Sequence, residues 1–190
     1  MKKGGKAMNF KFHISLSDDD YLEYNKFHML KSFYGARQLR LFRGVVALLF
    51  AAFILVYWIA GGFTLSAFLG SIPYFIAAIV FELLLKPFFM FILKRNIKQM
   101  KKQGKMAYSA LSNMEFYDGY FTEVTDENKT EQKYSAIERV SIVSNKNIYL
   151  HLNSVIAYII PIASFESKEQ YDAFVAFIKT KCANVDVYAK

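Results

Sequence analysis

The chain has 190 residues, 54% of them hydrophobic, and it carries a formal net charge of +8. Residues 1–105 hold 16 Lys and Arg against 5 Asp and Glu, whereas residues 106–190 hold 8 against 11. The positive charge therefore lies beside the most apolar part of the chain, and the tail is acidic. This distribution is typical of a membrane protein and argues against nucleic-acid binding, which would need a basic binding domain.

The first patterned segment follows the basic leader of residues 1–8. Apolar and polar side chains alternate there, with Phe10, Phe12, Ile14 and Leu16 on one face. A period of two predicts a half-buried strand. Because no neighbouring segment offers it a partner, we predict that this strand pairs with the distant tail of the chain.

A helix is predicted to begin after Ser17. Its first turn contains Asp18, Asp19 and Asp20, whose carboxylates complement the helix dipole. Adjacent acids also occur in metal sites, but no second group of ligands accompanies these three. The helix is expected to lead, with a break at Gly35, into the apolar segment that follows.

The apolar segment Gly44–Phe81 contains 38 residues and no Asp, Glu, Lys, Arg or His. One membrane crossing needs about 20 apolar residues, so two crossings fit, over residues 41–60 and 67–86 with a turn at Gly61-Gly62. A helical hairpin buried inside a soluble protein would need a larger core than this chain can supply. Basic residues flank both ends of the hairpin and are absent from its turn, which predicts a bacterial plasma-membrane protein with both termini in the cytoplasm.

The second crossing carries one acid, Glu82. Lys86 follows four residues later in the favourable orientation, so we expect an ion pair at the inner interface. If the crossing instead covered residues 72–93, Glu82 would lie in the middle of the bilayer and would be a functional candidate.

Residues 87–105 interleave apolar and basic side chains. They fit an amphipathic helix lying on anionic lipid, or a helix that only fixes topology; the two are compatible. The cations expected at the membrane surface are Arg37, Arg40, Arg43, Lys94, Arg95, Lys98, Lys101, Lys102 and Lys105.

Residues 106–166 read as about six short strands separated by turn signals such as Asp118-Gly119. A final helix begins with the capping box Ser167–Gln170, and its apolar stripe should pack on the sheet. With the N-terminal strand, these elements predict a seven-stranded pleckstrin-homology-like (PH-like) barrel or sandwich with a C-terminal helix. The fold class is thus a membrane α-helical hairpin plus an α+β cytoplasmic domain, divided as residues 1–40, 41–105 and 106–190.

Several segments also resemble the YcxB-like family of bacterial membrane proteins. They are DYLEYNKFH, RQLR, the KR-rich segment after Pro87, KYSAIERV and IPIASFESKEQYDAF. The resemblance implies two transmembrane helices and a PH-like cytoplasmic domain, and it brings no catalytic residues.

Sites for catalysis, a cofactor or a metal are not indicated. His13 and His151 fall on the polar phase of predicted strands and are expected to be solvated, and no Cys/His spacing fits zinc. Cys182 is expected to be an inert thiol at a helix end; as the single cysteine, it fits a reducing compartment. We therefore predict no enzyme activity.

Two functions remain open. The first is a membrane-anchored binding or scaffold module that meets anionic inner-leaflet lipids and a protein partner. The second is an accessory subunit of a transport or membrane-stress complex, self-associating through small hairpin residues, namely Gly61, Gly62, Ala67, Gly70 and Ser71.

Overall fold

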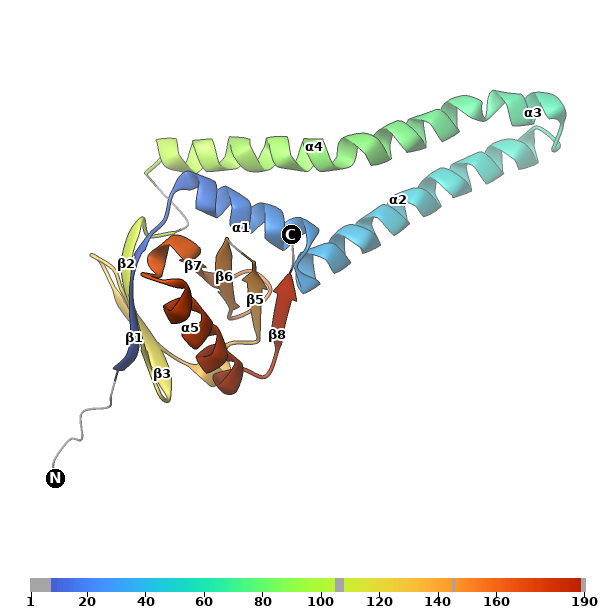
Figure 1. Cartoon of the computed structure of the whole chain (residues 1–190). Coiled ribbons are helices and arrows are strands. Elements are labelled where there is room, and N and C mark those ends of the chain that lie inside the picture. Colours follow the sequence, from blue (N-terminus) through green and yellow to red (C-terminus); the bar gives the residue numbers. More distant parts are fainter. Residues whose placement is uncertain (1–7, 105–107, 145, 189–190) are drawn as a thin grey trace. The chain divides into compact units, whose positions relative to one another are not determined.

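The computed structural model describes residues 8–104, 108–144 and 146–188. These residues form two compact units. A β unit joins residues 8–24 to residues 108–188, and a helical unit contains residues 25–104. The helix α1 (Asp18–Leu30) begins in the β unit and ends in the helical unit (Figure 1).

The helical unit is a hairpin of long helices (Figure 1). Its elements are α2 (Phe33–Ala60), α3 (Leu65–Gly70) and α4 (Ile72–Lys102). Aromatic rings meet along the length of α2 and α4, in the pairs Phe42–Phe89, Phe50–Phe81, Phe53–Tyr74 and Trp58–Phe75. The two arms are long and apolar enough to cross a membrane, and only 6% of each apolar window is buried, unlike the core helices of soluble proteins.

The hairpin turns at residues 61–64. Gly61 ends α2, and Gly62 has a φ of +69°, a conformation that glycine adopts without strain. Thr64 then caps α3, its hydroxyl accepting a hydrogen bond from the Ala67 amide. The two predicted crossings and the Gly61-Gly62 turn are thus present as helices and a turn.

The predicted break at Gly35 lies slightly earlier, between α1 and α2. Ser32 is the N-cap of α2 and accepts a hydrogen bond from the Gly35 amide at 3.1 Å. Gly35 lies inside α2, where an added Cβ would be 1.9 Å from the His28 carbonyl oxygen. The glycine is needed because the end of α1 packs against it, and not because the helix stops there.

The β unit contains eight strands within the described residues, arranged as two four-stranded sheets in the orders β1-β2-β3-β4 and β7-β6-β5-β8. The strands are β1 (Met8–Ser15), β2 (Leu111–Tyr117), β3 (Tyr120–Val124), β4 (Lys129–Lys133), β5 (Arg139–Val143), β6 (Asn147–His151), β7 (Ala157–Pro161) and β8 (Val185–Tyr188). The short helices η1 (Tyr134–Ala136) and η2 (Ile162–Ser164) and the helix α5 (Lys168–Lys181) complete the unit.

The N-terminal strand pairs with the tail, as predicted. β1 lies antiparallel to β2, with Phe12 opposite Met114 and Ser15 opposite Leu111. Phe12 and Ile14 are both 1% exposed, so the apolar face of the strand is buried. Because β1 precedes the hairpin and β2 follows it, one sheet joins the two ends of the helical unit's chain.

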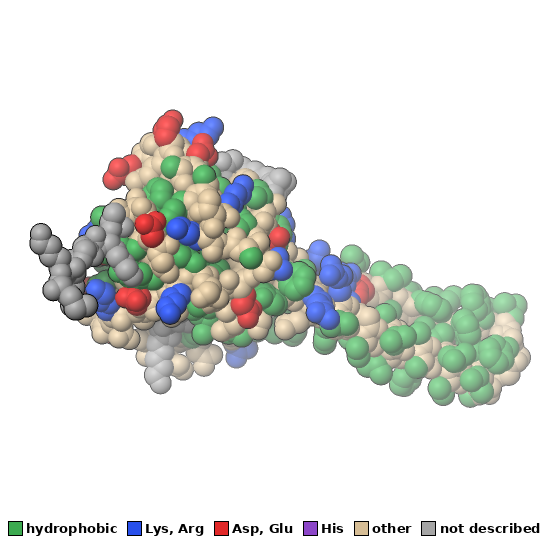
Figure 2. Space-filling model, turned by 90° about the horizontal axis from the view of Figure 1, so that it is seen from below, with side chains coloured by type: hydrophobic (Ala, Val, Ile, Leu, Met, Phe, Trp, Pro, Cys, Tyr) green, Lys and Arg blue, Asp and Glu red, His purple; other side chains and the backbone are tan. Residues whose placement is uncertain are grey.

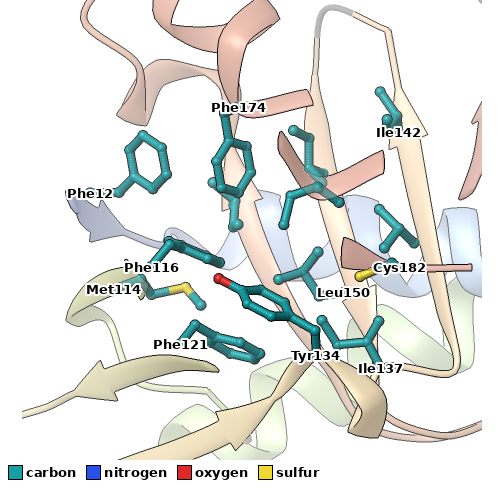
Figure 3. Close-up of a cluster of buried hydrophobic side chains, with 14 of the residues drawn as sticks. Phe12, Met114, Phe116, Phe121, Tyr134, Ile137, Ile142, Leu150, Phe174 and Cys182 are labelled. Carbon is teal, nitrogen blue, oxygen red and sulfur yellow. The ribbon is translucent and has the colours of Figure 1, made fainter. Parts of the chain in front are cut away.

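The core of the β unit lies between the sheets and α5 (Figure 3). Phe174 of α5 is fully buried and its ring lies 4.9 Å from the rings of both Phe12 and Phe116. The capping box of α5 is present: the Ser167 hydroxyl accepts from the Gln170 amide, and the Gln170 side chain accepts from the Glu166 amide. The apolar stripe of α5 therefore packs on the sheets, as predicted.

The sequence analysis did not predict β8, which runs parallel to β5 after α5. Its four residues are too few to show a pattern. The strand hydrogen bonds within the described residues form two separate sheets and do not close a barrel.

Candidate functional site

The basic residues predicted for the membrane surface lie on α2 and α4. Arg37, Arg40, Lys94, Arg95, Lys98, Lys101 and Lys102 are exposed, Arg43 is half-buried, and Lys105 lies outside the described residues. In Figure 2 the far part of the helical unit is covered by apolar side chains, and cations gather where this surface ends. The charge therefore separates the hairpin into an apolar part and a basic part.

Glu82 pairs across the hairpin. Its carboxylate lies 2.5 Å from the guanidinium of Arg43 on α2, where the sequence analysis expected Lys86 of its own helix. The side chains of Arg43 and Glu82 are 43% and 34% exposed, and Lys86 is exposed. Sequence spacing alone favours the partner one turn away, whereas the antiparallel packing brings the guanidinium of a second helix closer.

The level of this ion pair follows from helix geometry. Arg43 precedes the end of α2 at Ala60 by 17 residues. At 1.5 Å per residue, the pair lies about 26 Å from the hairpin turn. This length approaches the roughly 30 Å of a bilayer's hydrocarbon core.

Small residues near the turn make contacts within the hairpin. A Cβ on Gly61 would lie 2.6 Å from the Cβ of Ala67, and a Cβ on Gly70 would lie 2.4 Å from the Tyr57 hydroxyl. Ser71 is fully buried. Of the small residues considered for self-association, only Gly62 has open space where its Cβ would be.

The acids at the start of α1 make hydrogen bonds. Asp20 accepts from the Ser17 hydroxyl at 2.6 Å, and Asp18 accepts from the Tyr108 hydroxyl at 2.8 Å. Burial, and then this bond, raise the pKa of Tyr108 to about 12. No group of three or more potential metal ligands occurs within the described ranges. These carboxylates thus cap the helix, as the sequence predicted.

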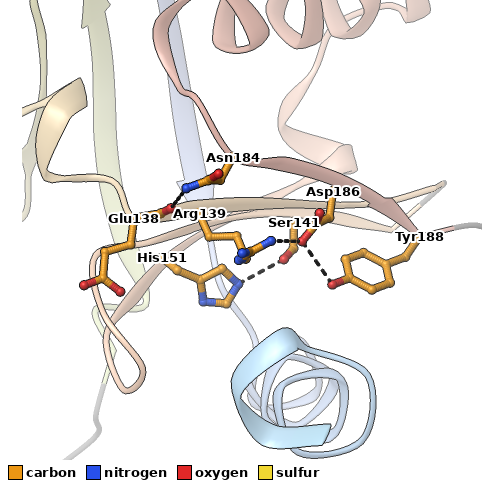
Figure 4. A network of polar contacts seen from close by, with 7 residues as sticks. All are labelled: Glu138, Arg139, Ser141, His151, Asn184, Asp186 and Tyr188. Atoms are coloured by element: carbon orange, nitrogen blue, oxygen red, sulfur yellow. Dashed lines mark hydrogen bonds and ion pairs between the residues drawn. The ribbon is translucent and has the colours of Figure 1, made fainter. Parts of the chain in front are cut away.

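Polar residues connect β5, β6 and β8 in the second sheet (Figure 4). The Arg139 guanidinium lies 2.5 Å from the Asp186 carboxylate, which also accepts a hydrogen bond from the Tyr188 hydroxyl at 3.4 Å. The Asn184 side chain donates to the Glu138 carbonyl at 3.0 Å. This network attaches the last strand to the body of the sheet.

The structure corrects the prediction for His151. The side chain is 1% exposed, and its Nε2 lies 3.2 Å from the hydroxyl of Ser141, which is fully buried. The rings of Tyr24 and Tyr149 lie 6.3 Å from the imidazole. Alternation placed His151 on the polar face correctly, but α1 contributes Tyr24 to that face, and a single strand's pattern does not reveal such a cover. His13 is exposed, as predicted, and contacts Asn113.

The chemistry available to these groups is restricted by burial. A hydroxyl bonded to an imidazole is the start of a nucleophile–base pair, but Ser141 and His151 are both closed to a substrate. Burial raises the pKa of Tyr24 and of Tyr149 to about 12. Cys182 is buried at the end of α5, and burial raises its pKa to about 11, so the thiolate form is disfavoured.

The loop between β6 and β7 exposes two apolar side chains that the sequence analysis did not single out. Val155 is 77% exposed and Ile156 is 55% exposed. Asn153 accepts hydrogen bonds from the amides of both residues at 2.8 Å, which fixes the loop. Only the Asn153-Ser154 turn signal marks this place in the sequence.

Comparison with known proteins gives one match. Residues 116–178, from within β2 to within α5, match the family described as YcxB-like protein. The chain is a YcxB-like protein. The matched residues include KYSAIERV and IPIASFESKEQYDAF, whereas the hairpin and β1 lie outside the match. No curated protein and no solved structure matches the chain.

Within the matched residues of this YcxB-like protein, the motifs have structural roles. Tyr134, in KYSAIERV, is buried and donates a hydrogen bond to the Tyr117 carbonyl at 2.7 Å. Phe165, in the second motif, lies 4.7 Å from Phe12 of β1. The matched region therefore contacts the strand that precedes the hairpin.

Proposed function

We propose that this YcxB-like protein is a membrane-anchored binding or scaffold module at the cytoplasmic face of a bacterial membrane. The hairpin crosses the bilayer twice, and the β unit is a PH-like domain held at the inner surface. Its partners are anionic inner-leaflet lipids and a protein, and no catalysis is part of the proposal.

The observation that carries the proposal is the pairing of β1 with β2. Partners run from Met8 opposite Tyr117 to Ser15 opposite Leu111, with one irregularity near Met8. Two strands hydrogen-bonded in one sheet lie on the same side of a membrane. The intervening chain must then cross an even number of times, and its two long apolar helices supply two crossings.

The charge distribution supports the cytoplasmic side. The residues between Gly44 and Phe81 carry no charge, and both flanks of that segment are basic. Exposed cations near an anionic surface each contribute about 1 kcal/mol of binding free energy. Lys94, Arg95, Lys98, Lys101 and Lys102 are exposed and would act in this way.

The PH-like assignment is supported by element order. Four strands, three more strands and a C-terminal helix follow one another, with the first strand supplied from before the hairpin. Such a domain offers its loops as contact surfaces, and the rigid Val155–Ile156 loop is one of them. Because fold alone does not define a ligand, the proposal names only the partner classes.

Topology reporters test the proposal. Fusions at Met8 and Lys190 should report from the cytoplasm, and an insertion at Thr64 should report from the opposite side. A cytoplasmic signal at Thr64, or an external signal at Lys190, would contradict the two-crossing anchor. A fusion at Gly104 is the matched control, since it follows both helices and should agree with Lys190.

A further inference from the structure

β8 is the least enclosed strand of the second sheet. It lies at the sheet edge, and its Val187 is 58% exposed. Only Val185 of this strand packs against the core. Its neighbour β5 is almost wholly covered, with Val140 and Ser141 fully buried. β8 therefore covers β5 while contributing little to the core itself.

The contacts that hold β8 are local and repeatable. The Val140 amide donates to the Asn184 carbonyl at 2.8 Å, and the Ser144 amide donates to the Tyr188 carbonyl at 3.1 Å. One side-chain ion pair, between Arg139 and Asp186, fixes the register. These backbone bonds and one charge pair can be made by an identical strand from another molecule.

The connection from α5 to β8 is short. Only residues 182–184 separate the two elements. Cys182 already has an extended backbone, with φ −120° and ψ 133°, so swinging β8 outward does not require α5 to unwind. Short hinges of this kind favour exchange of the terminal element between molecules.

We propose that two copies of this chain exchange β8, each adding its Val185–Tyr188 strand to the β5 edge of the other. The partner copy then contributes Asp186 to Arg139, and the exchange creates a two-fold symmetric pair. A second copy is the occupant because its strand carries the same residues in the same register. Anchoring in one membrane raises the effective concentration of the copies. The small hairpin residues at 61, 67 and 70 are already in contact within one chain, so the hairpin turn offers less for this purpose.

A charge-exchange experiment in the full-length protein tests the exchange. One tagged chain carries Arg139→Asp, and a second chain with a different tag carries Asp186→Arg. Each variant alone places like charges between β5 and β8, whether the strand is exchanged or not. Together they restore both ion pairs only when β8 passes between the two chains. We expect co-expression to increase co-purification from solubilised membranes by about tenfold over either variant with itself, the ratio that 1.4 kcal/mol produces.

Disulfide trapping gives a second measurement that does not depend on charge. Val143 and Tyr188 are register partners. In a Cys182→Ala background, co-expressed Val143→Cys and Tyr188→Cys chains should form a covalent heterodimer after oxidation. Val143→Cys with Val185→Cys is the matched control, because Val185 lies opposite Val140. A disulfide that forms only inside the Val143→Cys/Tyr188→Cys double variant, together with no co-purification of the charge-exchanged pair, would overturn the proposal.

Discussion

At the scale of single residues, buried polar side chains distinguish this β unit from a simple apolar sandwich. Glu123 lies on β3 opposite Met114, which is 1% exposed. Burial raises the pKa of the Glu123 carboxyl, and a hydrogen bond with Ser112 opposes the change. The charged form is therefore disfavoured in the folded protein.

We predict that Glu123→Gln stabilises the protein at neutral pH, by up to about 1 kcal/mol. A carboxyl whose folded-state pKa is raised destabilises the fold once the pH exceeds that pKa. The penalty disappears as the pH falls through the raised pKa toward the unfolded value, where both states are protonated. Thermal unfolding of the full-length protein at pH 7 and pH 4 should therefore show a gain only at pH 7. Exposed Glu131, on the neighbouring strand, is the control, and Glu131→Gln should show no gain at either pH.

The Arg43–Glu82 pair gives a second prediction at this scale. Both side chains are at least a third exposed, so each single substitution to Gln should cost about 1 kcal/mol or less. The double variant should cost less than the two singles together, because neither charge is left alone. Unfolding in detergent or nanodiscs measures the three variants. Lys86→Gln should have no effect, and a single-variant cost above about 3 kcal/mol would place the pair in a low-dielectric environment instead.

At the scale of elements, the end of α1 and the start of α2 depend on one glycine. We predict that Gly35→Ala destabilises the helical unit by more than 1 kcal/mol, since the new Cβ would meet the His28 carbonyl at 1.9 Å. Gly44→Ala is the matched control in the same helix, because nothing lies within 4 Å of its Cβ position. It should be neutral or stabilising by up to about 1 kcal/mol. Thermal melts of the two variants, compared with the unchanged protein, decide the point.

The strand β1 is a second element whose contribution can be measured. Phe12→Ala should cost about 3–5 kcal/mol, because the ring is 1% exposed and packs on Phe116, Phe165 and Phe174. Lys11→Ala, on the outer face of the same strand, should cost less than about 1 kcal/mol, although Lys11 pairs with Glu115 at 3.0 Å. Chemical unfolding of both variants tests this. Equal costs would mean that β1 is not part of the core.

At the scale of the whole molecule, the helical unit is an insertion into the β unit. Residues 8–24 and 108–188 share one core, and Tyr21 and Tyr108 lie with ring centres 4.9 Å apart beside the insertion point. We predict that a short Gly/Ser linker in place of residues 25–107 leaves a cooperatively folding, soluble β domain. The same chain without residues 8–15 should aggregate, because β2 would become an open edge above an exposed core. Circular dichroism and size-exclusion chromatography report both outcomes; a well-folded product without β1 would contradict the prediction.

The sequence by itself determined the elements whose signals are local. The charge-free run Gly44–Phe81 is long enough for two helices, and alternation in residues 9–16 marks a strand with one buried face. The capping boxes at Ser17 and Ser167 begin their helices where the sequence placed them. These features depend on periodicity and on neighbouring residues, so the tertiary structure was not needed to find them.

Only the tertiary structure decided which residues meet across long sequence separations. Glu82 takes Arg43 as its partner because antiparallel helices bring the two together, although Lys86 is nearer in sequence. His151 is buried because Tyr24 and Tyr149 lie beside it, and β8 forms because β5 offers an edge with Arg139 opposite Asp186. In each case the free energy comes from a contact between distant segments, and a pattern read along one segment contains no information about the other.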